Sequence, residues 1–144
     1  MIRAITTANA IQALASGAEF AIREGVVEWH SPDIPQPTEA EITAKLAELQ
    51  VAAQIEEYRV AVQQHIDAMA RSRDYENGFA LAGYVNSAVP PWKAEAEAFI
   101  AWRDQVWLFV FEKLAQVKAG EAVPPETAQA LIDTLPAVEW PNAV

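Results

Sequence analysis

The apolar residues of segment 91–119 recur at helical spacing and cover an unusually wide face. At about 100° per residue they gather on one side of a helix, and Gln105, Glu112 and Gln116 lie opposite. A face this wide has to be covered from at least two sides, so the pattern predicts the central helix of a core. We expect its structural core to comprise Phe99, Trp102, Arg103, Val106, Trp107, Val110 and Leu114.

Arg103 is the exceptional residue of this face. A cation in an apolar environment is costly unless it is paired. We therefore expect a buried or half-buried guanidinium, paired with a carboxylate of segment 67–76 or hydrogen-bonded to loop carbonyls. The functional alternative is that Arg103 captures an anion in a pocket.

A second, longer helix is predicted from residue 38 to about residue 73. Thr38 and Glu41 have the spacing of a capping box directly after Pro37, and no Gly or Pro interrupts the chain from there to Arg73. The apolar stripe of this helix changes face partway along. The earlier stripe consists of Ile42, Leu46, Leu49 and Ala53, and the later one of Val51, Ile55, Tyr58, Val62, Ile66 and Met69.

The two stripes need different neighbours, because one layer cannot cover opposite sides of a helix. The later stripe has the C-terminal helices available. For the earlier stripe, either the N-terminal segment folds back across a proline linker or a second protein covers it, since such a row of apolar side chains is rarely exposed in a monomer. We favour a second protein, and the hypothesised partner-binding residues are Phe20, Ile22, Val27, Trp29, Ile42, Leu46 and Leu49.

The N-terminal segment has a different pattern of apolar and polar residues. Residues 19–30 alternate apolar and polar positions around Glu24-Gly25, which predicts a short β-hairpin. Residues 1–5 are a candidate third strand, and residues 7–16 have the spacing of a short helix. The proline-rich residues 31–37 are expected to form an extended linker.

After the long helix, breaks divide the chain into shorter elements. Asn77-Gly78 is a turn signal, and a short helix is expected over residues 79–88, another over 124–133, and an extended end over 135–141. The predicted fold class is mainly α: a long helix and a helical hairpin form the C-terminal domain, preceded by a small β-hairpin module. The predicted domains are residues 1–37 and residues 38–144.

Composition narrows the possible partners. The chain has 144 residues, of which 52% are hydrophobic and 21% charged, enough apolar surface for a real core. Its formal net charge of −10 argues against nucleic acid and anionic membranes, both of which need a basic face. With no cysteine, disulfides and thiolate chemistry are excluded.

No catalytic constellation is evident. His30 and His65 are the two histidines, and a zinc site needs three or four convergent ligands. The carboxylate pairs Glu56–Glu57 and Glu95–Glu97 lie among alanines on predicted helices, which is typical of solvated faces. A glycosidase would need a cleft with two facing carboxylates, which the sequence does not indicate. We expect no enzyme activity, no catalytic or metal-binding residues and no cofactor.

Three motifs resemble a known domain. They are segment 73–84, the run Trp102-Arg103-Asp104-Gln105-Val106-Trp107 and the closing Leu-Pro-Ala-Val-Glu-Trp-Pro of residues 135–141. Together they resemble a small domain of tailed-phage and prophage genomes, encoded near or fused to tail-fibre genes. The resemblance covers roughly residues 55–141. The N-terminal part is similar to the openings of small tail-fibre assembly and tail-tip accessory proteins.

The resemblance implies a non-enzymatic bacteriophage protein that works by protein–protein interaction. It would be a tail-fibre or baseplate accessory protein, either an assembly chaperone or a minor structural protein of the virion. The implied partner is a tail-fibre or baseplate protein, or a second copy of the chain, and the implied location is the virion tail or the host cytoplasm during assembly. The alternative is a small acidic phage-encoded regulator that binds a host protein.

Overall fold

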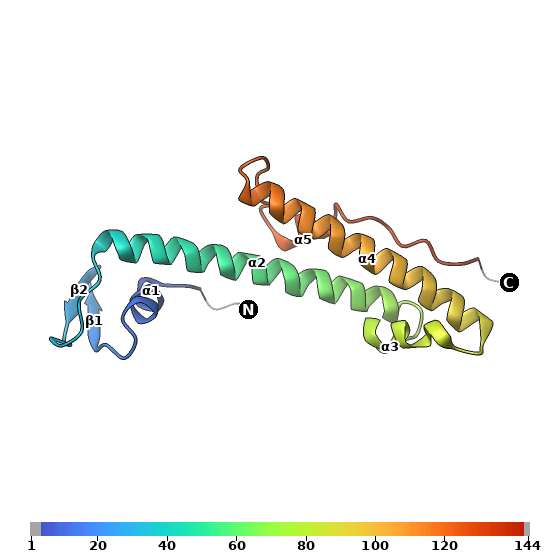
Figure 1. Cartoon of the computed structure of the whole chain (residues 1–144), viewed down its shortest axis with the longest axis horizontal. Helices are drawn as coiled ribbons and strands as arrows, with labels where there is room; N and C mark the ends of the chain where they lie inside the picture. Colours follow the sequence, from blue (N-terminus) through green and yellow to red (C-terminus); the bar gives the residue numbers. More distant parts are fainter. Residues whose placement is uncertain (1–3, 143–144) are drawn as a thin grey trace. The chain divides into compact units, whose positions relative to one another are not determined.

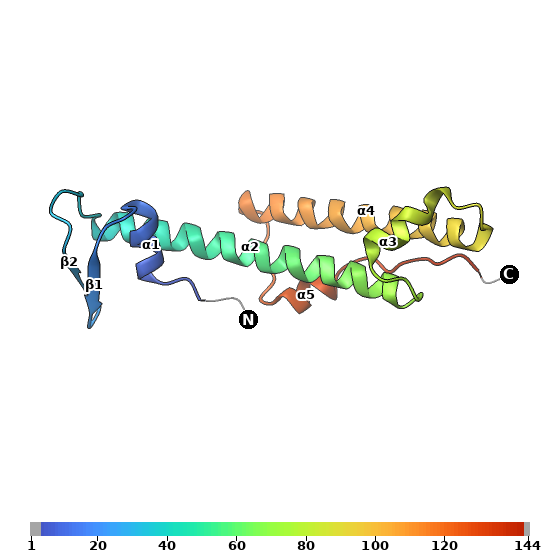
Figure 2. The same cartoon turned by 90° about the horizontal axis from the view of Figure 1, so that it is seen from below.

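The computed structural model describes residues 4–142 of the chain, and these residues are mainly helical with one small hairpin (Figures 1 and 2). The predicted fold class is confirmed. Of the candidate third strand, residues 1–3 lie outside the described residues, and Ala4 and Ile5 form no strand. In order, the elements are α1 (Thr7–Leu14), β1 (Phe20–Arg23), β2 (Val26–Trp29), α2 (Glu39–Arg71), α3 (Gly78–Ala82), the 3-10 helix η1 (Gly83–Asn86), α4 (Pro90–Lys118) and α5 (Ala128–Ile132).

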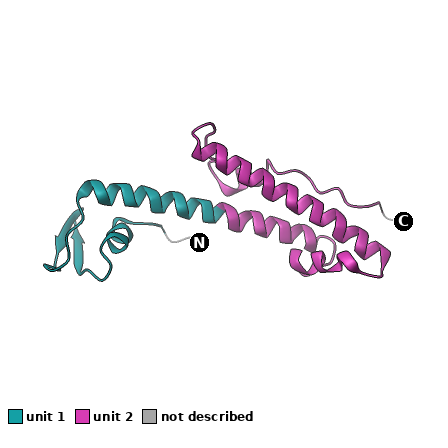
Figure 3. Ribbon diagram, viewed as in Figure 1, with its two compact units in different colours: residues 1–57 teal, residues 58–144 magenta. Residues whose placement is uncertain are grey.

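The chain divides into two compact units, residues 1–57 and residues 58–144 (Figure 3). Helix α2 supplies its residues up to Glu57 to the N-terminal unit and the rest to the C-terminal unit. This division differs from the one predicted at residue 37. The proline-rich segment does not separate the units, because the first turns of α2 pack on the elements that precede it.

The start of α2 has the predicted capping box. The backbone N–H of Thr38 donates to Glu41 Oε2 at 2.8 Å, and the N–H of Glu41 donates to Thr38 Oγ1 at 3.1 Å. Two N–H groups that a helix start leaves without helical partners are thereby satisfied. The helix then runs without interruption to Arg71, two residues short of the predicted end.

Strands β1 and β2 form the predicted antiparallel hairpin. Phe20 pairs with Trp29 and Arg23 with Val26, which leaves Glu24 and Gly25 as a two-residue loop. Both loop residues have positive φ, 50° and 80° respectively, the conformation whose twist matches that of the flanking strands. The rings of Phe20 and Trp29 stack across the strands with centroids 6.2 Å apart.

The earlier stripe of α2 is covered by its own chain. Ala10 and Ile11 of α1 form a buried cluster with Ile42, and five partly buried residues pack against it: Phe20, Val27, Trp29, Leu46 and Leu49. The internal alternative, that the N-terminal segment folds back on this stripe, is therefore what the structure shows: Ile42 is buried by it, and Leu46 and Leu49 are half-buried. The prediction considered only the hairpin as an internal cover, whereas α1 supplies the buried centre of the cluster.

The proline-rich segment is held against the hairpin. The indole N–H of Trp29 donates to two carbonyl oxygens, of Ser31 at 2.7 Å and of Ile34 at 3.0 Å. Pro37 is buried just before the capping box. The prediction of an extended linker over residues 31–37 is therefore wrong for its first half. Ser31 to Ile34 form a turn, in which the Ile34 N–H donates to the Ser31 carbonyl at 3.1 Å, and this turn is fixed to Trp29.

In the C-terminal unit, the second half of α2 runs antiparallel to α4, with α3 and η1 in the connection between them (Figures 1 and 2). The larger of the two buried clusters lies between α2 and α4. Phe99, Trp102 and Val106 are buried members of it, as predicted. Burial of this much apolar surface is the main stabilising contribution to such a fold. The buried members are Val62, Ile66, Ala70, Leu81, Ala96, Phe99, Trp102, Val106 and Leu131.

The chain after α5 runs extended beside the helices of this unit and completes the core (Figures 1 and 2). Leu135, Val138 and Trp140 pack against the cluster. The indole N–H of Trp102 donates to the carbonyl of Pro136 at 2.7 Å, and the guanidinium of Arg73 lies 4.7 Å from the centroid of the Trp140 ring. At the other end of α4, the Tyr58 hydroxyl donates to the carbonyl of Pro125.

Two residues of the predicted core lie at its margin. Arg103 is half-buried, as predicted, but its guanidinium pairs with the adjacent Asp104 at 3.0 Å and not with a carboxylate of segment 67–76. Trp107 is half-buried and stacks on the exposed ring of Phe111 at 5.9 Å. The buried stripe of α4 follows Ala96, Phe99, Trp102 and Val106, which is narrower than the whole apolar face. Val110 and Trp107 pack against the cluster from its edge, and Leu114 is partly buried.

Gly78, at the start of α3, lies where no side chain fits. A Cβ atom there would be 3.0 Å from Phe99 Cζ and 3.1 Å from Asp67 Oδ1, which already accepts a hydrogen bond from the Gly78 N–H at 2.9 Å. The Phe99 ring is fully buried and has no room to move away.

We therefore expect Gly78→Ala to lower the free energy of unfolding of the C-terminal unit by about 1–3 kcal/mol, the usual cost of overpacking. Urea unfolding measures the change. The matched control is Gly83→Ala, because a Cβ at Gly83 would meet nothing within 4 Å and its φ of −63° is helical. That variant should be neutral or stabilised by about 0.4–1 kcal/mol. Equal stability of the two variants would contradict the tight contact at Phe99.

Candidate functional site

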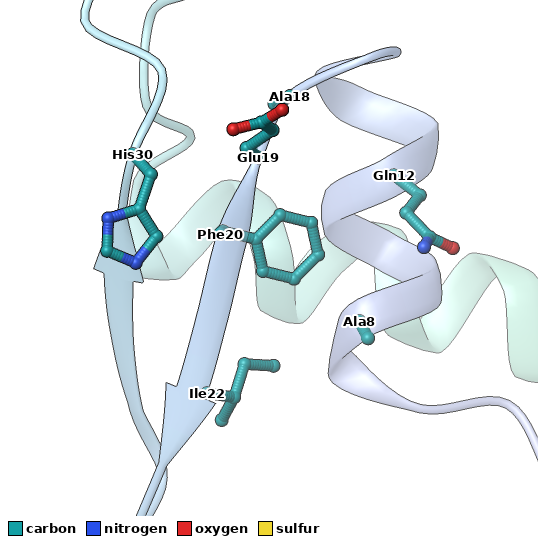
Figure 4. Close-up of a pocket in the computed structure, with 7 residues that line it drawn as sticks. All are labelled: Ala8, Gln12, Ala18, Glu19, Phe20, Ile22 and His30. Carbon is teal, nitrogen blue, oxygen red and sulfur yellow. The ribbon is translucent and has the colours of Figure 1, made fainter.

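A pocket of about 540 Å³ opens in the N-terminal unit between α1 and β1 (Figure 4). Ala8 and Gln12 line it from α1, and Phe20 and Ile22 from β1. Ala18, Glu19 and His30 complete the lining from the chain just before β1 and just after β2. It is a shallow depression, open to solvent over much of its extent.

The pocket combines an apolar floor with polar groups. Phe20 and Ile22 project from the same face of β1 because side chains two residues apart in a strand share a face, and Figure 4 shows both on the side of α1. Ile22 is 38% exposed, a large value for an apolar side chain. Glu19 contributes a carboxylate, Gln12 an amide and His30 an imidazole, so the lining offers one fixed negative charge and no fixed positive charge.

The structure separates the hypothesised partner-binding residues into two groups. Six of them pack together in the internal cluster of the N-terminal unit: Phe20, Val27, Trp29, Ile42, Leu46 and Leu49. Ile22 is exposed and lines the pocket, and Phe20 both packs in the cluster and reaches the pocket. The pocket could not be predicted from the sequence. One of its walls is α1, and the sequence indicated only that this segment is helical, not that it packs beside β1.

The C-terminal unit exposes a second apolar surface, on α4. Leu108 is 68% exposed and Phe111 59% exposed, and Trp107 stacks on Phe111. Phe79 on α3 is 92% exposed. Sequence reasoning missed this surface because it assigned the wide apolar face of α4 to the core. The available signal was the width of that face. It is wider than one neighbouring helix can cover, which indicates that part of it is exposed.

Three aromatic rings form a chain at the start of α4. The centroid of the Tyr84 ring lies 5.4 Å from that of Tyr75 and 5.5 Å from that of Trp92, both in edge-to-face geometry. Burial raises the pKa of the Tyr75 phenol, and the negative charge of Glu95 raises it further. Glu95 Oε2 is shut off from solvent and accepts no hydrogen bond from a described residue. The Tyr75 phenol is thus harder to ionise than a free tyrosine, which suits a packing role.

Neither histidine belongs to a metal site among residues 4–142, where no group of three or more potential ligands converges. His65 contacts the Trp102 ring at 5.8 Å between centroids, and His30 lines the pocket. Within the same residues, no helix combines the length and the apolar character that crossing a membrane requires.

Comparisons of the chain with protein-family models, with curated proteins and with solved structures gave no match.

Proposed function

We propose that this chain is a non-enzymatic accessory protein of a bacteriophage tail, which binds a tail-fibre or baseplate protein. It acts as an assembly chaperone or as a minor component of the virion. The observation that carries the binding role is the pocket of the N-terminal unit, where exposed Ile22 and the edge of Phe20 are available to another polypeptide. The assignment to a phage tail rests on the resemblance of residues 73–84, 102–107 and 135–141.

The exposed apolar side chains support a binding role. A soluble protein exposes single apolar side chains routinely, but neighbouring ones mark interaction surfaces. Leu108 and Phe111 lie one helical turn apart on α4, so they form such a pair. The N-terminal pocket adds a concave surface with polar groups at its edge.

Charge favours a partner with a basic surface. The chain carries a formal net charge of −10, and the pocket contributes the Glu19 carboxylate. Opposite charge on a partner accelerates encounter and restricts the choice of partner. The same charge also suits the alternative role, a phage-encoded regulator that binds a basic surface of a host protein.

Co-expression with the tail-fibre and baseplate proteins of the same phage tests the proposal. We expect the full chain to co-purify with one of them, and Ile22→Glu to reduce recovery about tenfold or more by placing a charge in the apolar pocket. Val51→Glu is the matched control, because Val51 is exposed in the same unit but lies outside the pocket. This variant should bind normally.

Recovery of a host protein in place of any tail protein would overturn the proposal in favour of the regulator. Detection of the chain in purified particles would distinguish a virion component from a chaperone that leaves after assembly.

A further inference from the structure

We propose that the pocket binds an extended segment of the partner as a third strand on the outer edge of β1. This inference rests on the proposed function, protein binding through the N-terminal unit, and specifies how that binding occurs. The occupant is an extended polypeptide with alternating apolar residues and at least one basic residue.

The register of the hairpin determines which backbone groups are free. In an antiparallel pair, the residues of one strand point their N–H and C=O alternately toward the partner strand and away from it. The His30 N–H donates to the Glu19 carbonyl at 2.9 Å, so Glu19 and then Ala21 and Arg23 face β2. The N–H and C=O groups of Phe20 and Ile22 consequently point outward.

These outward groups have no hydrogen-bond partner among residues 4–142. Unpaired groups on an edge strand are a ready template for another strand. A sheet of two strands is also only marginally stable, and a third strand with an apolar face strengthens it. An added strand would therefore pair the free backbone groups of β1 and stabilise the sheet.

The pocket adjoins β1. Four of its lining residues belong to β1 or the two residues before it, and α1 stands on the side of β1 away from β2 (Figure 4). A strand added to β1 places every second side chain on the face of Phe20 and Ile22, in contact with α1. Apolar residues suit those positions, and a lysine or arginine suits the position near Glu19.

The edge of β2 is a poorer template. The outward residues there are Val27 and Trp29, and the chain from Ser31 to Ile34 is held to the Trp29 indole by two hydrogen bonds. The lining of the pocket includes no residue of β2 itself. Strand addition is therefore assigned to β1.

Proline at Ile22 tests the backbone component directly. Proline lacks an N–H, and it is tolerated on an edge strand where that N–H faces outward. Ile22→Pro removes one outward donor and no bond to β2. Ile22→Val is the matched control, because it keeps both the donor and a β-branched apolar side chain.

The probe is a short synthetic peptide of alternating valine and threonine with a lysine at each end, titrated into the isotope-labelled full chain. We expect the amide signals of Phe20 and Ile22 to shift and to become protected from exchange. Ile22→Pro should weaken binding about tenfold or more, the loss of about 1.4 kcal/mol, and Ile22→Val should bind within about twofold of the parent.

A second measurement guards against misfolding of the proline variant. The same peptide with N-methyl groups on alternate residues cannot donate to β1, and it should not bind the unaltered chain. Equal binding of both peptides, or a lack of any shift at Phe20 and Ile22 at millimolar peptide, overturns the strand-addition inference. The proposed function then still stands or falls by the separate co-purification of intact tail proteins.

Discussion

Trp102→Ala is expected to destabilise the C-terminal unit by about 3–5 kcal/mol, the usual cost of deleting a large buried aromatic side chain. Trp102 is only 3% exposed and contacts Phe99 at 5.9 Å between ring centroids. Its truncation leaves a cavity and also removes the donor to the Pro136 carbonyl. Since many domains have a total stability of about 5–15 kcal/mol, the variant should be close to unfolding.

Urea unfolding followed by near-ultraviolet circular dichroism measures this loss. The matched control is Trp92→Ala on the same helix, because Trp92 is 47% exposed and its ring meets that of Tyr84 edge to face. We expect a loss of about 1 kcal/mol or less from it. If both tryptophan variants melted within a degree or two of the parent, Trp102 would not be a core residue.

Ile11→Ala should unfold the N-terminal unit locally. Ile11 is fully buried at the centre of the cluster formed by α1, the hairpin and the first turns of α2. Replacing a buried isoleucine with alanine costs about 2–5 kcal/mol, and a unit of this size has little stability in reserve. The backbone amides of β1 and β2 should then lose their protection.

Hydrogen exchange of the full chain, resolved by peptide, reports the two units separately. We expect faster exchange over residues 7–49 and unchanged exchange over the α4 core. Leu14→Ala is the control, because Leu14 lies on the same helix and its side chain is exposed. Uniformly faster exchange along the whole chain would contradict the independent stability of the units.

Elements with strong local signals were predicted well from the sequence. The capping box at Thr38 and the absence of Gly and Pro afterwards defined α2 to within two residues at its end. Alternation around Glu24-Gly25 defined the hairpin, whose two-residue loop needs positive φ. These features depend on near neighbours in the chain, so a single sequence contains them.

Features that depend on tertiary packing were predicted less well. Periodicity placed Trp107 and Arg103 on the apolar face of α4, but the position of α2 decides how much of that face is buried. The sequence correctly indicated that the first stripe of α2 needs a covering element. That element is α1, and the short apolar stripe of α1 did not indicate which neighbour it packs against. The pocket was not foreseen for the same reason, since its walls come from two elements.

The tail that completes the C-terminal core has a consequence for translation. Trp102 donates to a carbonyl 34 positions further along the chain, and Leu131 is buried beside residues of α2 and α4. A ribosome therefore releases both long helices before residues 131–140 emerge. Until then the helices cover one another, but the part of the Trp102 cluster that Leu131 and the tail cover stays exposed. A premature stop codon between α4 and α5 yields a product in which this part of the core stays permanently exposed, and we expect cellular proteases to degrade it.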